Sequence, residues 1–464
     1  MLDALHQPDS AGEGSGTSLL APAEALLERR LASRTATVAV IGLGYVGLPL
    51  ALAVAEAGFR TLGFDRDAGR LAGLAAGRSP LRQLPAEALC AALRSGRFTP
   101  AHDEALGAAD AVLICVPTPL GRHREPDLSC VEDAARQVAR HLRPGQLVVL
   151  ESTTYPGTTR EVVLPILEAG GLACGRDFFL AYSPEREDPG NAEHRTAGIP
   201  KVVGGADPAS LRLALALYGA VVERTVPVDG LETAEAVKLT ENVFRAVNIA
   251  LVNELKLVLG AMGLDVWKVI EAAATKPFGY MPFWPGPGPG GHCIPVDPFY
   301  LAWKARAHGV PARFVELAGE VNAAMPGHIL DRLARALDAT QGRGLRDSRI
   351  LLLGVGYKRN LEDVRESPAL RLMGLLEARG AAVDYFDPLV PRLPRPLPDH
   401  PGLAGRRSIP WPATAEALRR YHAALIVTDH DGVDYATLVA EARLVVDTRN
   451  LCARLGLSGQ VVTA

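Results

Sequence analysis

A lone thiol stands in a loop that is built largely of glycine and proline. The stretch "GPGPGGHCIPVDP" covers residues 286–298, with His292 directly before Cys293 and Asp297 four residues after it. The glycines leave room for a ligand beside the sulfur. A helical pattern follows the loop, and a thiol near a helix N-terminus is expected to have a lowered pKa. The loop therefore suggests a nucleophilic cysteine, with a buried structural thiol as the alternative.

Two other uses of this loop are disfavoured. A metal site is not expected, because no further cluster of cysteine or histidine accompanies His292 and Cys293. A Cys/His protease dyad is also disfavoured, because adjacent side chains usually diverge.

A second group of polar residues lies in a long helical pattern over residues 231–262, which Gly263 ends. Lys238, Asn242 and Arg245 are spaced four and three residues apart, so they share one face of that helix. A lysine and an asparagine on an inward face need polar partners. The group is either a solvated stripe or part of the same site as the cysteine.

Near the start of the chain, "VIGLGYVGLPL" places Gly42, Gly44 and Gly47 between a β-branched run and an alanine-rich helical pattern. A second predicted strand ends at Asp65. This is the fingerprint of a dinucleotide-binding turn, in which the glycines admit a pyrophosphate at the helix N-terminus. Asp65 would bind a ribose diol and repel a 2′-phosphate, which favours NAD over NADP, although nearby Arg70 softens that preference.

Strands and helices then alternate, which predicts a parallel doubly wound sheet with Thr118 and Thr153 at its ligand-binding strand ends. The last third repeats this outline but lacks the third glycine after Gly354 and Gly356. Its loop carries Lys358 and Arg365, which suit a phosphorylated ligand. We therefore expect an α/β protein with two Rossmann-like doubly wound parallel sheets joined by a long central helix.

Composition narrows the function classes. A net charge of −3 argues against a nucleic-acid binder, and no apolar run approaches the roughly 20 residues that cross a bilayer. The six cysteines are scattered, which favours a reducing, cytoplasmic setting over a disulfide framework. Residues 1–34 have no signal-peptide pattern and are expected to form a mobile extension.

A thiol beside a nicotinamide can add to an aldehyde, and loss of hydride from the thiohemiacetal gives a thioester that water cleaves. An alcohol would thus become an acid in two oxidations. A simple two-electron alcohol dehydrogenase and a catalytically silent NAD-binding regulator stay open.

The whole pattern resembles the UDP-glucose/GDP-mannose dehydrogenase family. The resemblance rests on "VIGLGYVGLPL", "VPTP", "ESTTYPGTT", "SPERE", "KLTEN", "GGHCIPVDP" and "YKRNLEDVRESP". It implies an NAD-binding domain over residues 35–228, a central helical dimerisation domain over 229–328 that holds the cysteine loop, and a UDP-sugar domain over 329–464. It also implies a homodimer or a higher homo-oligomer.

The resemblance implies three sets of site residues. The catalytic set is Cys293, Lys238, Asn242, Asp297, Glu185 and Thr153. The cofactor set is Gly42, Gly44, Tyr45, Val46, Gly47, Asp65, Arg70, Thr118, Thr153 and Arg365. The substrate set is Glu185, Arg186, Glu187, Lys238, Asn242, Arg245, Gly290, Tyr357, Lys358 and Arg449.

Two positions bear on the subgroup. Family members that act on UDP-glucose usually carry serine and lysine where this chain has His292 and Val296. The resemblance is strongest to enzymes that oxidise C6 of UDP-N-acetylglucosamine for surface polysaccharides. Gly279 stands where the UDP-N-acetylmannosamine enzymes typically carry arginine, which disfavours that substrate. UDP-N-acetylmannosamine and UDP-glucose are the alternatives.

Overall fold

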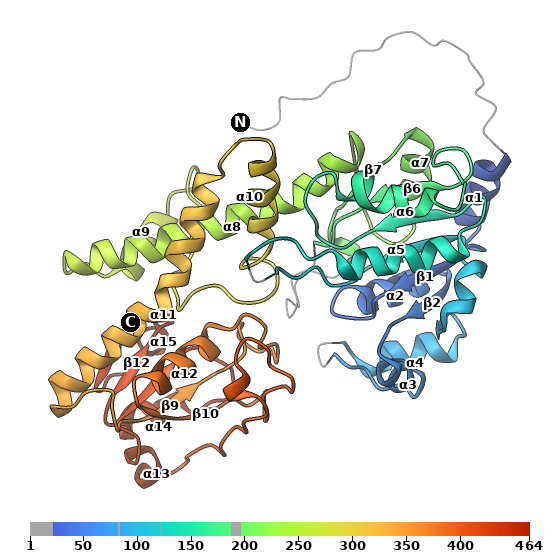
Figure 1. Cartoon of the computed structure of the whole chain (residues 1–464). Coiled ribbons are helices and arrows are strands. Elements are labelled where there is room, and N and C mark those ends of the chain that lie inside the picture. The colour runs from blue at the N-terminus through green and yellow to red at the C-terminus, as the bar shows by residue number, and fades with distance from the viewer. Residues whose placement is uncertain (1–21, 82–83, 122, 187–195) are drawn as a thin grey trace.

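A computed structural model describes residues 22–81, 84–121, 123–186 and 196–464 and shows two α/β units joined by long helices (Figure 1). The first unit is built on an eight-stranded sheet in the order β3-β2-β1-β4-β5-β6-β7-β8. Its neighbouring strands are parallel except for β6 and β7, which are antiparallel. The strands are β1 (Thr37–Ile41), β2 (Arg60–Phe64), β3 (Phe98–Pro100), β4 (Ala111–Ile114), β5 (Leu147–Leu150), β6 (Phe179–Tyr182), β7 (Lys201–Gly205) and β8 (Thr225–Val228).

Both faces of this sheet are buried, as the continuous apolar strands require. Val38, Val40 and Val149 pack into a core with α2 (Gly47–Glu56) and α7 (Pro208–Tyr218) on one face. Ile41, Ile114 and Leu150 pack into a second core with α5 (Ser129–His141) and α6 (Leu164–Glu168) on the other. At about 1.5–3 kcal/mol for each large apolar side chain, this two-sided burial fixes the strand ends where ligands bind.

The second unit has a five-stranded, wholly parallel sheet in the order β10-β9-β11-β12-β13. The expected second Rossmann-like sheet is therefore confirmed. Helices α12 (Pro368–Ala378) and the end of α11 pack on one face, and α13 (Ala415–Arg419) and α14 (Tyr435–Glu441) on the other. The strands are β9 (Arg349–Leu353), β10 (Ala382–Phe386), β11 (Ala423–Ile426), β12 (Val445–Asp447) and β13 (Val461–Thr463).

Long helices connect the two units (Figure 1). The expected central helix is α8 (Gly230–Ala261), and Gly263, at φ +74°, follows its end. Next come α9 (Val266–Ala274), α10 (Asp297–Ala307) and α11 (Arg313–Gln341), which packs along α8 and runs into the second unit. The boundary expected after residue 328 falls inside α11.

The start of the chain corrects one expectation. Residues 1–21 lie outside the described part, but residues 22–32 form α1 (Pro22–Ala32) rather than a mobile extension. Leu27 and Leu31, one turn apart, are buried against the first unit, and Arg30 Nη1 donates to Asp110 Oδ1 at 2.7 Å. The apolar repeat buries one face of α1, and this burial orders the segment.

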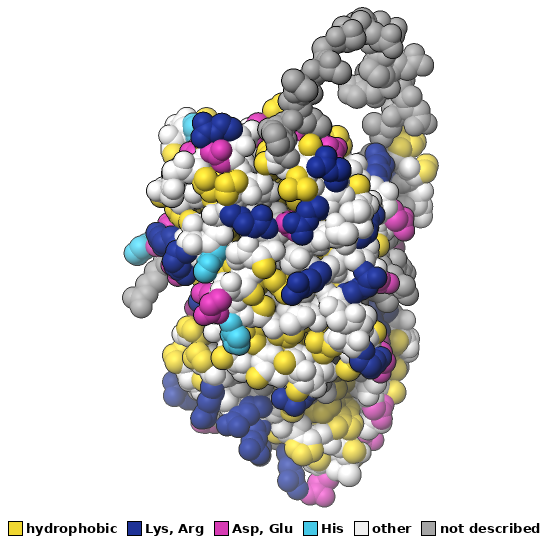
Figure 2. Space-filling view, turned by 90° about the vertical axis from the view of Figure 1, so that its right-hand side faces the viewer, with side chains coloured by type: hydrophobic (Ala, Val, Ile, Leu, Met, Phe, Trp, Pro, Cys, Tyr) yellow, Lys and Arg dark blue, Asp and Glu magenta, His cyan; other side chains and the backbone are white. Residues whose placement is uncertain are grey.

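Side chains of different kinds share the surface on one side of the molecule. Figure 2 shows positive, negative and apolar side chains interspersed over the face that lies on the right of Figure 1. Among the described residues, no helix is long and apolar enough to cross a membrane.

Candidate active site

A cleft of about 1750 Å³ runs between the first sheet's strand ends, the cysteine loop and the second unit. Its volume exceeds the roughly 300–1,000 Å³ usual for one ligand, so two ligands fit side by side. The predicted site residues that line it are Gly42, Gly44, Tyr45, Val46, Asp65, Arg70, Thr118, Thr153, Glu185, Lys238, Cys293, Asp297 and Arg365.

The glycine turn leaves a cradle at the start of α2. Gly42 has φ +91°, and a Cβ there would lie 2.6 Å from the Cys115 carbonyl oxygen. At Gly47 a Cβ would come within 1.8 Å of the Gly42 oxygen, so this glycine lets the helix pack against the turn. Gly44 faces open space, with nothing within 4 Å of a built Cβ. The turn therefore fits a pyrophosphate at a helix N-terminus.

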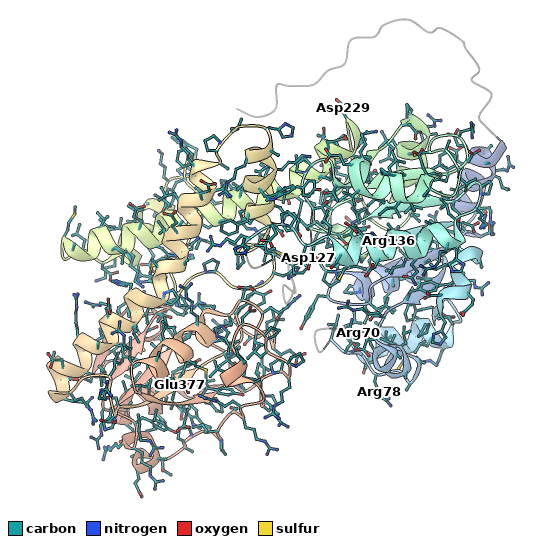
Figure 3. All side chains as sticks on the ribbon, viewed as in Figure 1. Arg70, Arg78, Asp127, Arg136, Asp229 and Glu377 are labelled. Carbon is teal, nitrogen blue, oxygen red and sulfur yellow. The ribbon has the colours of Figure 1, made fainter. Side chains whose placement is uncertain are left out.

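Asp65 is more constrained than the sequence suggests. Its Oδ2 accepts hydrogen bonds from Leu43 N at 2.9 Å and from Arg70 Nη1 at 2.8 Å, and its Oδ1 accepts one from Asp67 N at 2.9 Å. A carboxylate has about four acceptor positions, so about one remains for a ribose hydroxyl. Figure 3 shows Arg70 on the side of the first unit that is nearest the second.

Arg365 reaches across the cleft from the second unit. Its guanidinium lies 4.7 Å from the centroid of the Tyr45 ring and pairs with Asp363 at 2.5 Å. Its carbonyl accepts a hydrogen bond from Gly291 N at 2.9 Å. Arg365 therefore joins the glycine turn, the cysteine loop and the second unit at one point.

Two residues of the helical triplet are buried and Arg245 is half-buried, which excludes the solvated stripe. Lys238 is 6% exposed and Asn242 is fully buried. Asn242 Nδ2 donates to Asp297 Oδ2 at 2.5 Å, and Arg245 donates to the Asn242 side-chain oxygen. The polar face of α8 thus meets the first residue of α10.

The cysteine does not have the lowered pKa that its place before a helix predicts. Burial, reinforced by Asp297, raises the pKa of Cys293 to about 11 against the opposing effect of Lys238. Burial also raises the pKa of Asp297 to about 7, and Lys238 and Asn242 limit that rise. Enclosure outweighs the helix terminus, so the thiol holds its proton at neutral pH and must lose it when sulfur attacks.

His292 is a site residue that sequence analysis missed. Its Nε2 lies 3.5 Å from Cys293 Sγ, so these adjacent side chains do meet. Its Nδ1 is buried and has no hydrogen-bond partner among the described residues. Burial, together with Arg365 and Lys238, lowers the His292 pKa to about 4. The available sequence signal is the glycine directly before it, which permits a tight turn. In the structure this residue, Gly291, does have a positive φ of +78°.

Several predicted substrate contacts lie outside the cleft lining. Tyr357 packs under the cysteine loop, because a Cβ at Gly290 would come within 2.6 Å of it. Arg449 donates through Nε to Val427 O at 2.8 Å, and Arg186 donates to Pro200 O at 2.6 Å. The remaining members outside the lining are Lys358, Arg245, Gly290 and Asn242. Glu187 lies outside the described residues.

Comparison with known proteins identifies the three parts of the chain. Residues 36–222 match the NAD binding domain of the UDP-glucose/GDP-mannose dehydrogenase family, residues 232–324 its central domain and residues 351–454 its UDP binding domain.

Individual relatives agree with that assignment. The chain is 38% identical over 356 residues to UDP-N-acetyl-D-glucosamine 6-dehydrogenase of Pseudomonas aeruginosa, covering 76% of this chain and 83% of the relative. It is 33% identical to NDP-N-acetyl-D-galactosaminuronic acid dehydrogenase of Ralstonia nicotianae, over 89% of this chain and 96% of the relative.

Solved structures give the same answer. The structure of UDP-D-ManNAc dehydrogenase from Pyrococcus horikoshii superimposes with a TM-score of 0.81 at 31% identity, covering 92% of this chain and 99% of that one. These matches extend over both sheets and the helices between them. The protein therefore belongs to the UDP-glucose/GDP-mannose dehydrogenase family of NAD-dependent nucleotide-sugar oxidoreductases.

Proposed function

We propose that this enzyme oxidises the C6 hydroxyl of a UDP-N-acetylhexosamine, in first place UDP-N-acetylglucosamine, to the uronic acid through a thiohemiacetal and a thioester on Cys293. The observation that carries the proposal is that Cys293, Lys238 and Asp297 line the same cleft as the glycine turn. The substrate is supported by two relatives named UDP-N-acetyl-D-glucosamine 6-dehydrogenase, from Pseudomonas aeruginosa and Salmonella typhi, at 38% and 35% identity.

In the first half of the proposed reaction, the C6 hydroxyl loses a proton to a base and becomes a carbonyl. Bound NAD supplies a hydride acceptor for each of the two oxidations. Asp297, whose pKa of about 7 lets it exchange protons at neutral pH, is the proposed base. The Lys238 ammonium, buried at the cleft wall, stabilises the negative oxygen.

In the second half, the Cys293 sulfur bonds to the carbonyl carbon, and its proton is transferred to the carbonyl oxygen. Oxidation of that adduct gives the thioester. Glu185, which lines the cleft, is the proposed base for the water that cleaves it. The water oxygen bonds to carbon, the carbon–sulfur bond breaks, and the acid and the free thiol are released.

The experiment that tests this proposal also tests other substrates. Relatives named for UDP-N-acetyl-D-mannosamine and for N-acetyl-D-galactosaminuronic acid are 34% and 33% identical to this chain, so these epimers are the second candidates, with UDP-glucose behind them. We would supply each nucleotide sugar with NAD and count the NADH formed per sugar. Two NADH support the proposal, one indicates a simple alcohol dehydrogenase, and none with any sugar indicates a regulator.

We further propose that two copies associate through the connecting helices, in the cytoplasm, to supply surface-polysaccharide synthesis. The support for association is a set of exposed apolar side chains on these helices, since exposed apolar surface of this kind marks interaction sites. These side chains are 36–78% exposed and comprise Phe244, Leu251, Leu255, Leu257, Val258 and Met262 near or on α8, Val269 on α9, and Phe314 and Leu317 on α11. Sedimentation as a monomer at micromolar concentration would refute it.

A further inference from the structure

A buried ion pair borders the cleft, and the proposed mechanism does not use it. Lys201, the first residue of β7, places Nζ 2.6 Å from Glu151 Oε2, and both side chains are at most 7% exposed. Tyr218 of α7 donates its hydroxyl to Glu151 Oε1. A buried pair gains little net stability over an apolar one of the same size. The location of the pair explains its presence better than stability does.

The pair holds two loops that face the cleft. Glu151 follows β5 directly, two residues before Thr153, which lines the cleft. Lys201 Nζ also lies 3.4 Å from the Pro184 carbonyl oxygen, which it reaches as a second acceptor. Pro184 immediately precedes Glu185, another lining residue. One ammonium group therefore ties together the strand ends that present Thr153 and Glu185.

The charges of the pair also interact with Glu185. Burial raises the pKa of Glu151, Lys201 opposes that rise, and Glu185 adds to it. Burial would lower the pKa of Lys201, but the carboxylates of Glu151 and Glu185 outweigh it and raise the pKa overall. Lys201 is thus the internal cation to which both carboxylates are coupled.

We propose that Glu151 and Lys201 are positioning residues that hold Glu185 in place for hydrolysis of the Cys293 thioester. This inference rests on the proposed function. In the step concerned, a water oxygen bonds to the thioester carbon, the carbon–sulfur bond breaks, the Cys293 thiolate leaves, and one water proton passes to Glu185. Lys201 lies behind the cleft wall and Glu151 forms part of that wall, and both act on Glu185 through the loop that leads to it.

The test is accumulation of the acylated enzyme. Lys201→Met should slow turnover about 100-fold, as a base displaced by about 1 Å would. Intact-protein mass spectrometry during turnover should then show a covalent sugar-nucleotide adduct on Cys293, with KM for the sugar nucleotide nearly unchanged. Glu185→Gln is the reference variant and should show the same adduct.

A matched control lies at the opposite, N-terminal ends of the strands in the same sheet, where Asp110 directly precedes β4. Asp110 is 3% exposed and accepts hydrogen bonds from Arg30, Arg143 and Thr37 N. Asp110→Asn should lower the melting temperature without producing the adduct. The double variant Glu151→Gln/Lys201→Met leaves no unpaired buried charge, so it should regain stability while its turnover stays slow.

Two results with the Lys201 variants would overturn the proposal. One is wild-type hydrolysis in folded Lys201→Met, and the other is a double variant whose turnover recovers together with its stability. If Lys201→Met does not fold, the double variant decides. If Glu185→Gln turns over normally without an adduct, Glu185 is not the base for hydrolysis, and the positioning role of Glu151 and Lys201 is refuted as well. An adduct in Glu185→Gln but not in Lys201→Met refutes the positioning role alone.

Discussion

The two sheets begin with nearly the same turn but use it differently. In each, a glycine at positive φ follows the first strand and donates to the neighbouring strand's carbonyl: Gly42 N to Phe64 O at 2.8 Å, and Gly354 N to Phe386 O at 2.9 Å. In each, an aspartate ends that neighbouring strand and accepts from the turn: Asp65 from Leu43 N, Asp387 from Val355 N.

The difference lies in what surrounds the turn. Asp387 is fully enclosed, because its carboxylate also accepts from Gly356 N, Leu389 N, Val390 N and His430 Nε2. A Cβ at Gly356 would come within 2.3 Å of Leu361 O, whereas Gly44 faces open space. The second turn is filled by its own chain, so shared topology does not make a dinucleotide site. That site needs an open cradle and an acid with an acceptor position left.

The largest effect expected from this comparison concerns stability. Asp387→Asn should lower the free energy of unfolding by about 3–5 kcal/mol, because a buried, fully bonded carboxylate is lost. Asp65→Asn should lower it less, by about 1–2 kcal/mol, because the Asp65 carboxylate accepts three hydrogen bonds rather than five and its partner Arg70 is 35% exposed. Urea unfolding of both variants at neutral pH measures the contrast, and equal losses would break it.

The loss of stability caused by Asp387→Asn should depend on pH. Burial would raise the pKa of Asp387, but hydrogen bonds from His430 and from backbone N–H groups outweigh it and hold the pKa below its usual value. A carboxyl group whose pKa is lowered in the folded state contributes its full stabilisation when the pH is above its pKa in the unfolded chain, which is about 4. That contribution is lost as the pH falls through the lower pKa of the folded state. The stability gap between wild type and Asp387→Asn should therefore narrow as the pH falls below about 4.

The next effect concerns cofactor affinity. Gly44→Val should raise the Kd for NAD about 100-fold, equivalent to about 2.8 kcal/mol, while leaving the melting temperature unchanged. The reason is that its side chain would enter the open cradle without touching protein. Gly356→Val should lower the melting temperature and leave the Kd for NAD unchanged, because its side chain would meet Leu361 O. Titration calorimetry and thermal unfolding of both variants check these two expectations. A Gly356→Val variant with an unchanged melting temperature and weakened NAD binding would contradict them.

The smallest effect concerns cofactor choice. Asp65→Asn should narrow the preference for NAD over NADP by about tenfold, because it removes a negative charge where a 2′-phosphate would lie but leaves Arg70 in place. The ratio of kcat/KM for the two cofactors measures this. An unchanged ratio would mean that Arg70, not Asp65, sets the preference.

The parts of this molecule that sequence predicts well are local. The glycine turn, the strand that ends at Asp65, the central helix with its glycine stop and the strands of the second sheet all follow from short-range patterns. The parts that it misses depend on distant segments. The Cys293 pKa reflects burial and charges on Asp297, Lys238, Arg245 and Arg365, which come from three separate stretches of chain. No window around the cysteine contains that information.

Helix α11 also depends on contacts between distant segments. Pro326 normally argues for a break, because proline lacks an N–H and crowds the preceding turn. Here α11 continues through Pro326, which is buried along with Ile329 and Leu330. Packing against α8 and the second sheet provides the burial that sustains the helix. Tertiary contact therefore overrides a local signal, and the expected domain boundary fell inside a continuous helix.

The central claim is that Cys293 carries the substrate as a covalent intermediate, and Cys293→Ser tests it most directly. We would measure NADH formed per nucleotide sugar by this variant, using the sugar that the wild type oxidises. Serine is a far weaker nucleophile at neutral pH, so overall turnover should fall by several orders of magnitude while NAD and the sugar nucleotide still bind. Full four-electron oxidation by Cys293→Ser at a rate near that of the wild type would contradict the account.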